Sequence, residues 1–211
     1  MDGAAEVGLV GMAIRTDSGG AGYDPSSNIR IDEELFAADP GIGLSIMACS
    51  FGTENIIEFG TEDQKERFLP DVASGDAISG AAISEPDTGS DVSSISTRAE
   101  KDGDEYVING NKMWITNGTV GDYFVVLAET DPDADDRYAG YSQILVEADR
   151  AGFDTQKITG KLGITAADTA ELILDDVRVP AHNLLGARGT GFAHLMQISH
   201  DNRTGPAAPG V

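Results

Sequence analysis

The feature that most constrains the fold is a series of short strand-like segments between residues 77 and 180. Turn dipeptides separate them, including Asp102-Gly103, Asn109-Gly110 and Asn117-Gly118. This pattern predicts an antiparallel barrel or sandwich, not the parallel sheet of a nucleotide-binding βαβ unit. The expected strands are Ala77–Ile83, Ser94–Glu100, Glu105–Asn109, Tyr123–Glu129, Ser142–Glu147, Gly152–Lys157 and Thr169–Val179.

Two further patterns bear on this region. Alternation of residue types in Tyr123–Glu129 predicts a strand that is buried on one face only. No Gly-x-Gly-x-x-Gly motif follows a strand, so the sequence gives no support to a Rossmann fold.

Residues 1–75 predict helices joined by glycine-rich loops. Asn28 is placed like a helix cap, and Ile42–Phe59 is an apolar stretch of helical length. Gly60 is suited to end that helix. Thr61 to Gln64 resembles a capping box that opens a further helix, which we expect Pro70 to stop.

A sequence pattern typical of helices returns after Pro180. Gly186, Gly189 and Gly191 predict a turn, and Phe192–His200 predicts the beginning of an apolar helix. The order of elements is therefore helices, strands, and then the first part of a helix, which corresponds to an α+β class.

The charge balance is strongly acidic, with 14 Lys and Arg against 36 Asp and Glu and a formal net charge of −22. Such a chain is repelled by nucleic-acid backbones and anionic membranes, so we expect neither as a partner. An acidic binding surface or a nucleic-acid mimic is one explanation, and a salt-adapted, halophilic surface is the other. The acidic residues are spread along the chain rather than collected in a tail, which favours the halophilic explanation.

Cysteine usage and the N-terminal residues indicate the compartment. Cys49 is the only cysteine, so neither an internal disulfide nor a cysteine metal cluster is expected. Met1 is followed by Asp-Gly-Ala-Ala-Glu rather than by a basic and then apolar leader. No apolar run approaches the length of a membrane span. These features predict a cytoplasmic protein.

The segment Ile83–Asp91 (ISEPDTGSD) reads as a strand leading into a tight polar turn. The hydroxyls of Ser84, Thr88 and Ser90 and the amide of Gly89 can donate to an anionic or carbonyl-rich ligand. The alternative is an ordinary β-turn whose serines and aspartates satisfy local backbone groups.

A second segment, Asn109–Gly118 (NGNKMWITNG), carries the only tryptophan and reads as a short strand between two hairpin turns. A tryptophan on a strand is usually a core residue. Between two turns, however, Trp114 can offer a flat face to a planar ring, and Thr116 points to the same side of the strand.

In their order and separation, these two segments resemble the flavin-binding strands of the acyl-CoA dehydrogenase family. Leu44–Asp76 and Lys161–Phe192 are also similar to the segments that enter and leave that family's middle domain. The resemblance implies a helical N-terminal domain, a β-domain and a C-terminal four-helix bundle. We therefore expect an incomplete helical domain at residues 1–76, the β-domain at 77–182, and a truncated start of the bundle at 183–211.

The resemblance also implies FAD as cofactor. Ser84 would bond the pyrimidine edge of the flavin, Trp114 would pack on the ring system, and Thr116 would bond N5. Ser90 and Arg203 would contact the CoA substrate. The full expected FAD-binding set is Ala81, Ala82, Ile83, Ser84, Glu85, Pro86, Asp87, Thr88, Gly89, Ser90, Trp114, Ile115 and Thr116.

The implied reaction is α,β-dehydrogenation of an acyl-CoA thioester, with FAD as hydride acceptor. It needs a carboxylate base, which in the family lies late in the bundle or immediately before the arginine matching Arg203. Asn202 occupies the latter position and cannot take a proton. The side chain of the adjacent Asp201 points roughly 100° away from that position on a helix. A lone histidine on a partly apolar helix, such as His200, is more often structural than catalytic. We therefore expect no catalytic base and no metal site in this chain.

By resemblance, the partners are an acyl-CoA substrate and electron-transferring flavoprotein as the electron acceptor. The chain would act as a homo-oligomer or with a complementing C-terminal chain. Two alternatives stay open. One is a catalytically silent flavin- or acyl-CoA-binding module, and the other is an acyl-CoA oxidase or nitroalkane oxidase on the same scaffold.

Overall fold

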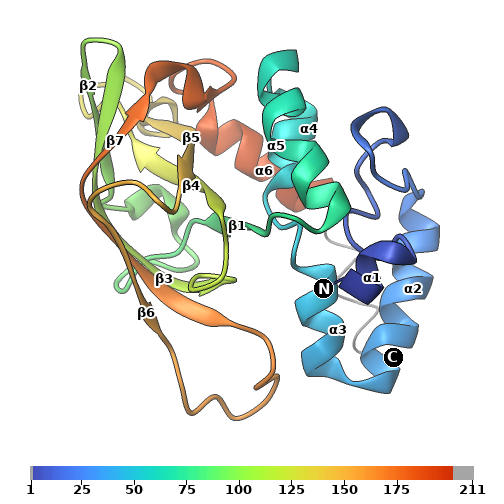
Figure 1. Cartoon of the computed structure of the whole chain (residues 1–211). Coiled ribbons are helices and arrows are strands. Elements are labelled where there is room, and N and C mark those ends of the chain that lie inside the picture. Colours follow the sequence, from blue (N-terminus) through green and yellow to red (C-terminus); the bar gives the residue numbers. More distant parts are fainter. Residues whose placement is uncertain (1, 202–211) are drawn as a thin grey trace.

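The computed structural model describes residues 2–201 and has helices on one side of a twisted sheet (Figure 1). The predicted α+β class is confirmed. The helices are α1 (Asp2–Glu6), α2 (Pro25–Ala38), α3 (Pro40–Met47), α4 (Thr53–Phe59), α5 (Glu62–Ser74) and α6 (Gly191–Asp201). The strands are β1 (Ser79–Ala82), β2 (Arg98–Asp102), β3 (Glu105–Thr116), β4 (Tyr123–Glu129), β5 (Tyr141–Glu147), β6 (Phe153–Lys157), β7 (Thr169–Pro180) and β8 (Leu184–Leu185).

The strands form one 8-stranded sheet in the order β6-β7-β3-β2-β4-β5-β8, with β1 pairing to β4 beside this path. Most neighbours are antiparallel, as predicted. The pairings β1–β4 and β2–β4 are parallel, so the sheet is mixed. The strand order runs from β6 to β8 without joining them, and the sheet is therefore not a closed barrel.

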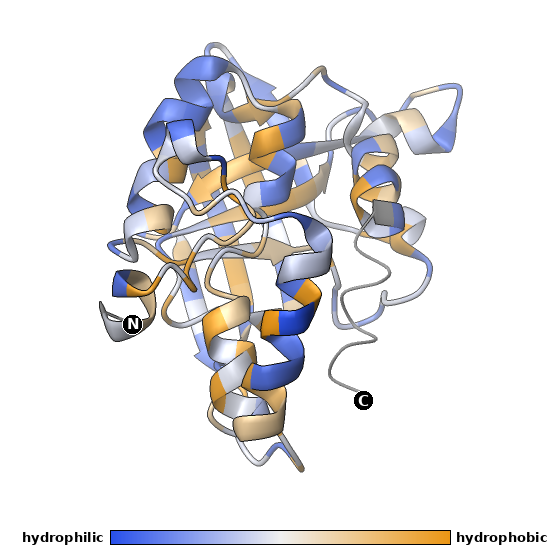
Figure 2. Cartoon of the chain, turned by 90° about the vertical axis from the view of Figure 1, so that its right-hand side faces the viewer, coloured by the Kyte–Doolittle hydropathy of each residue, from blue (hydrophilic) through white to orange (hydrophobic). Residues whose placement is uncertain are grey.

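Strand β4 has the predicted bounds but is buried on both faces, so the expectation of a half-buried strand is wrong. Phe124 and Val126 pack inside the folded sheet, against residues of β3, β5 and β7. Tyr123 and Val125 face the helices and pack against α4 and α5. Figure 2 shows hydrophobic residues in the strands that lie behind the helices and on parts of the helices themselves. A strand covered on both faces loses the alternation that marks a surface strand.

The stretch Ile42–Phe59 is not one helix, contrary to the prediction. Helix α3 ends at Met47 and α4 begins at Thr53, with Gly52 between them at φ 91. A Cβ atom on Gly52 would lie 2.9 Å from the carbonyl oxygen of Gly80 in β1. The chain breaks here because it passes directly against the sheet, which an unbroken helix could not do.

The other helix boundaries were also predicted imperfectly. Helix α2 is capped by Asp24, whose carboxylate accepts from Ser26 N at 2.9 Å, and Asn28 lies inside the helix. Pro70 does not stop α5, which continues to Ser74. Its apolar face runs on past the proline through Val72, which is fully buried, and packing of that face compensates for the lost backbone bond.

The capping box at the start of α5 is confirmed. Thr61 Oγ1 accepts from Gln64 N at 3.2 Å, and Gln64 Oε1 accepts from Thr61 N at 2.9 Å. Thr61→Ala is expected to lower the free energy of unfolding by about 1 kcal/mol, since one helix N–H group loses its acceptor. Urea unfolding measures this, with Thr61→Ser as the matched control that keeps the hydroxyl. Equal stability of the alanine and serine variants would contradict the assignment.

Strand β3 is longer than predicted because Asn109-Gly110 does not form a hairpin. Both residues lie within the strand, where the pairing with β7 shifts register between Ile108 and Gly110. Gly110 has φ 148, and a Cβ atom there would approach Thr97 Oγ1 to 2.5 Å. Across this interval β7 carries the extra residue of the bulge, and Gly110 lies at the end of it, where the missing side chain allows a close contact with the segment entering β2.

Among residues 2–201, no helix combines the length and the apolar character that a bilayer crossing requires.

Candidate functional site

The two motifs singled out from the sequence are neighbours in the structure. Met113 N donates to Ser84 O at 2.8 Å, and Lys112 Nζ donates to Ile83 O at 3.1 Å. Both contacts join β3 to the loop that follows β1. The tryptophan segment and the polar turn therefore form one continuous surface, although about thirty residues of chain separate them.

Trp114 lies in a β-bulge. Lys112 pairs with Leu172 and Ile115 with Ala170, so β3 carries one more residue than β7 across this interval. Trp114 has φ 64, in the left-handed region that a bulky residue rarely adopts, and the residue is 63% exposed. Such conformations cost of order 1–3 kcal/mol and cluster at binding sites. The bulge turns the largest side chain of the segment outward instead of into the core.

The remaining residues predicted to bind FAD divide by burial. Pro86, Asp87, Gly89 and Ser90 are exposed, and Ala81, Ile83, Ser84 and Thr116 are half-buried. The side chains of Ala82, Glu85, Thr88 and Ile115 are buried and can reach a ligand only through their backbone.

The hydroxyl groups of this surface differ in their availability. Thr88 Oγ1 donates to Ser94 O at 3.1 Å and is occupied. Within residues 2–201, the hydroxyls of Ser84, Ser90 and Thr116 make no hydrogen bond to another protein group. An exposed indole and unoccupied hydroxyls are groups that a planar, polar-edged ligand requires.

A buried ion pair that was not predicted from the sequence lies next to this surface. Lys112 Nζ lies 2.9 Å from Glu85 Oε1, and their side chains are 0% and 3% exposed. A signal for it was present in the sequence. Lys112 follows Tyr106 and Ile108 at two-residue spacing, on the face of β3 that points inward, and a lysine at such a position requires a buried partner.

The environment of the pair keeps both groups charged near neutral pH. Burial by itself raises the pKa of Glu85, but the Lys112 ammonium and the hydrogen bonds from Thr97 and Ser96 outweigh it and lower the pKa to about 2. Burial lowers the pKa of Lys112, and the Glu85 carboxylate opposes that change.

These shifts predict a pH dependence of stability. The pKa of Glu85 in the folded state lies below its ordinary 4.5, so its stabilisation is complete above pH 4.5 and is lost as the pH falls toward 2. The stability difference between the native protein and Glu85→Gln should therefore shrink by about 3 kcal/mol over that range. Urea unfolding at stepped pH values measures it. A difference that stays constant from pH 6 to pH 3 would contradict the shifted pKa.

Asn117 fixes the end of β3 next to Thr116. It has φ 64 and is buried, and its Nδ2 donates to Ala48 O at 2.6 Å and to Ser79 O at 2.9 Å. One side chain thus ties the end of α3 and the start of β1 to the tryptophan strand. The sequence indicated only a turn at this position.

The residues considered for substrate binding and proton transfer lie at the end of the described chain. Arg203 and Asn202 are outside the described residues, and His200 is exposed in the last turn of α6. Within residues 2–201, no cluster of three or more His, Cys, Asp or Glu side chains is arranged to hold a metal ion.

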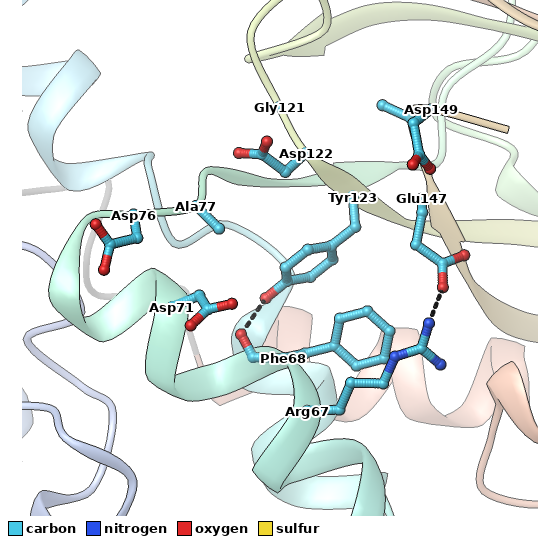
Figure 3. Close-up of a pocket in the computed structure, with 11 residues that line it drawn as sticks. Arg67, Phe68, Asp71, Asp76, Ala77, Gly121, Asp122, Tyr123, Glu147 and Asp149 are labelled. Carbon is cyan, nitrogen blue, oxygen red and sulfur yellow. Dashed lines mark hydrogen bonds and ion pairs between the residues drawn. The ribbon is translucent and has the colours of Figure 1, made fainter.

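A cavity of about 600 Å³ opens between α5 and strands β4 and β5. Figure 3 shows the residues that line it. Arg67 forms an ion pair with Glu147 at its edge, and the Tyr123 hydroxyl donates to Phe68 O at 3.2 Å. The other charged residues of its lining, Asp71, Asp76, Asp122 and Asp149, are acidic. None of the residues predicted to bind FAD lines it, so the hollow and the tryptophan surface are separate features.

Two family models match the chain. Residues 1–76 match the family model described as acyl-CoA dehydrogenase, N-terminal domain, and residues 80–177 match acyl-CoA dehydrogenase, middle domain. Mitochondrial isovaleryl-CoA dehydrogenase of Pongo abelii is 40% identical over 191 residues, which are 90% of this chain and 45% of that protein.

Solved structures agree with these matches. The acyl-CoA dehydrogenase from Geobacillus kaustophilus superposes with a TM-score of 0.90 at 39% identity, over 99% of this chain and 55% of that one. The acyl-CoA dehydrogenase of Bacillus anthracis complexed with FAD gives 0.90 at 35% identity, over 99% of this chain and 35% of that one. The chain spans about half the length of the curated relatives that it matches first.

Proposed function

The chain belongs to the acyl-CoA dehydrogenase family, and we propose that Ile83–Asp91 and Trp114–Thr116 form one wall of an FAD site. The observation that carries this proposal is the exposed Trp114. Its backbone has positive φ within a β-bulge, next to a loop whose hydroxyls make no hydrogen bond to the protein. Backbone strain that turns the indole toward solvent does not improve core packing. It does expose a flat surface on which a planar ring can stack.

The groups present on this surface fit a flavin. Trp114 supplies an apolar face for the ring system, while the hydroxyls of Ser84 and Thr116 supply donors for its polar edge. Gly89 has no neighbouring atom within 4 Å of the position a Cβ would take, so the loop leaves open space above its backbone. The bacterial relative described with FAD supports the same assignment.

The proposed reaction is α,β-dehydrogenation of an acyl-CoA thioester, with a catalytic base that the residues of this chain are not expected to supply. FAD, when bound, supplies the hydride acceptor. The residues of this chain hold and orient that cofactor, so that the reacting atoms can be kept at close range. Ser90 and Arg203 are proposed to contact the CoA part of the substrate, with Arg203 lying outside the described residues.

The proposed organisation is a helical segment at residues 1–76, the sheet domain at 77–182, and the start of a second helical domain at 183–211. Electron-transferring flavoprotein is the proposed electron acceptor, and a homo-oligomer or a complementing helical chain is the proposed assembly. The family-model matches and the helix–sheet–helix order support the proposed organisation.

The test is equilibrium dialysis of the purified chain against FAD, in salt high enough to screen its net charge of −22. Bound FAD is expected to be retained and to show flavin bands displaced from those of free FAD. Because no catalytic base is expected in this chain, anaerobic addition of an acyl-CoA is expected to leave these bands unbleached. Retention of no FAD in excess of the free concentration would refute the proposed site.

A further inference from the structure

The ion pair between Lys112 and Glu85 joins the two segments that carry the proposed flavin wall. Lys112 comes from β3 and Glu85 from the loop after β1, with 2.9 Å between Nζ and Oε1. The Lys112 side chain is fully buried. Trp114, two residues further along β3, is by contrast exposed.

The Glu85 carboxylate is held by a third segment as well. Oε2 accepts from Ser96 N at 2.7 Å and from Ser96 Oγ at 2.8 Å. Oε1 accepts from Thr97 N at 2.9 Å and from Thr97 Oγ1 at 2.5 Å. The carboxylate is thus anchored to the chain entering β2, and Lys112 completes its shell of donors.

These contacts hold Ser84 itself and the residues immediately before and after it. Lys112 Nζ donates to the carbonyl of the residue before it, Ile83, and pairs with the side chain of the residue after it, Glu85. Met113 N donates to the carbonyl of Ser84 itself at 2.8 Å. The backbone of Ser84 and the bulge that presents Trp114 are therefore set by one buried network.

A buried ion pair is an expensive way to gain stability, because two charges lose their hydration and an apolar pair of similar volume often stabilises as well. Unlike an apolar contact, a hydrogen-bonded ion pair is directional and fixes both partners in one geometry. We propose that Lys112 and Glu85 are a positioning pair, which holds Ser84 and Trp114 in the mutual arrangement that FAD requires. This inference rests on the function proposed above.

The test uses the single tryptophan of the chain as its reporter. Trp114 emission and its quenching by acrylamide, a neutral quencher that the acidic surface does not repel, report the bulge without any cofactor. A titration with FAD, followed by quenching of the same emission, reports affinity. Both are measured on Lys112→Met and Glu85→Gln, below the unfolding transition of each variant. Lys65→Met is the matched control, because it removes a lysine whose partner Glu62 is exposed.

The positioning role predicts a changed Trp114 emission and an FAD affinity reduced by about tenfold or more in both variants, with the control unchanged. A purely structural pair would instead leave the folded variants with native emission and native affinity, and that result would overturn the inference. Should Lys112→Met fail to fold, Glu85→Gln alone decides, since it keeps the volume and the acceptor oxygen. If the native chain itself binds no FAD, the proposed function fails, and the acrylamide experiment still judges the positioning pair.

Discussion

Trp114→Ala is expected to lower the affinity for FAD by tenfold to a hundredfold, that is by about 1–3 kcal/mol, the usual contribution of an aromatic platform under a stacked base. The free energy of unfolding should change by less than about 0.5 kcal/mol, because Trp114 is 63% exposed and contributes little to the core. The combination of a large binding effect with a negligible stability effect is the expected signature of a ligand-facing residue.

Equilibrium dialysis with FAD measures the first quantity and urea unfolding the second. Trp114→Phe is the matched control, since it keeps an aromatic face in the same bulge and should retain most of the affinity. Comparison of Trp114→Gly with Trp114→Ala separates the effect of backbone strain from that of losing the ring, because only glycine relieves the cost of φ 64. A glycine or alanine variant that binds FAD as tightly as the native chain would remove Trp114 from the site.

Lys112→Met is expected to lower the free energy of unfolding by about 3–5 kcal/mol, the usual cost of removing one partner from a buried ion pair. Methionine fills similar space, so the loss arises mainly from the Glu85 carboxylate, which stays buried with only the Ser96 and Thr97 donors. This variant should be less stable than any that removes a surface charge.

Urea is the appropriate denaturant for this measurement, because guanidinium chloride would also screen the net charge of the chain. Lys65→Met breaks an exposed pair on α5 and should cost under about 1 kcal/mol. The buried-pair account is wrong if the two lysine variants lose equal stability.

Much of the fold could be predicted because its signals are local. Tyr123–Glu129 has the predicted bounds of β4, and the Thr61–Gln64 capping box opens α5 as expected. The errors arise where distant contacts decide the local structure. Gly52 interrupts a helical stretch because Gly80 lies against it. Asn109-Gly110 stays within β3 because β7 pairs with the residues of β3 both before and after this dipeptide.

The candidate site shows the same division. The polar turn and the tryptophan strand were identified from their residues, and the hydrogen bond from Met113 to Ser84 places them together. The burial of the Glu85 side chain could not be predicted from the motif alone, because its partner Lys112 lies 27 residues away. Positive φ at Trp114 was equally hidden, since a bulge depends on the register that the neighbouring strand imposes.

The central claim is that Trp114 faces a bound flavin, and one resonance tests it. The chain has a single tryptophan, so a nitrogen–proton correlation spectrum contains a single indole N–H peak. FAD added in steps is expected to shift or broaden this peak until it saturates, while ADP, which lacks the flavin, leaves it in place. An indole peak that stays unchanged at saturating FAD, or that responds equally to ADP, would contradict the account.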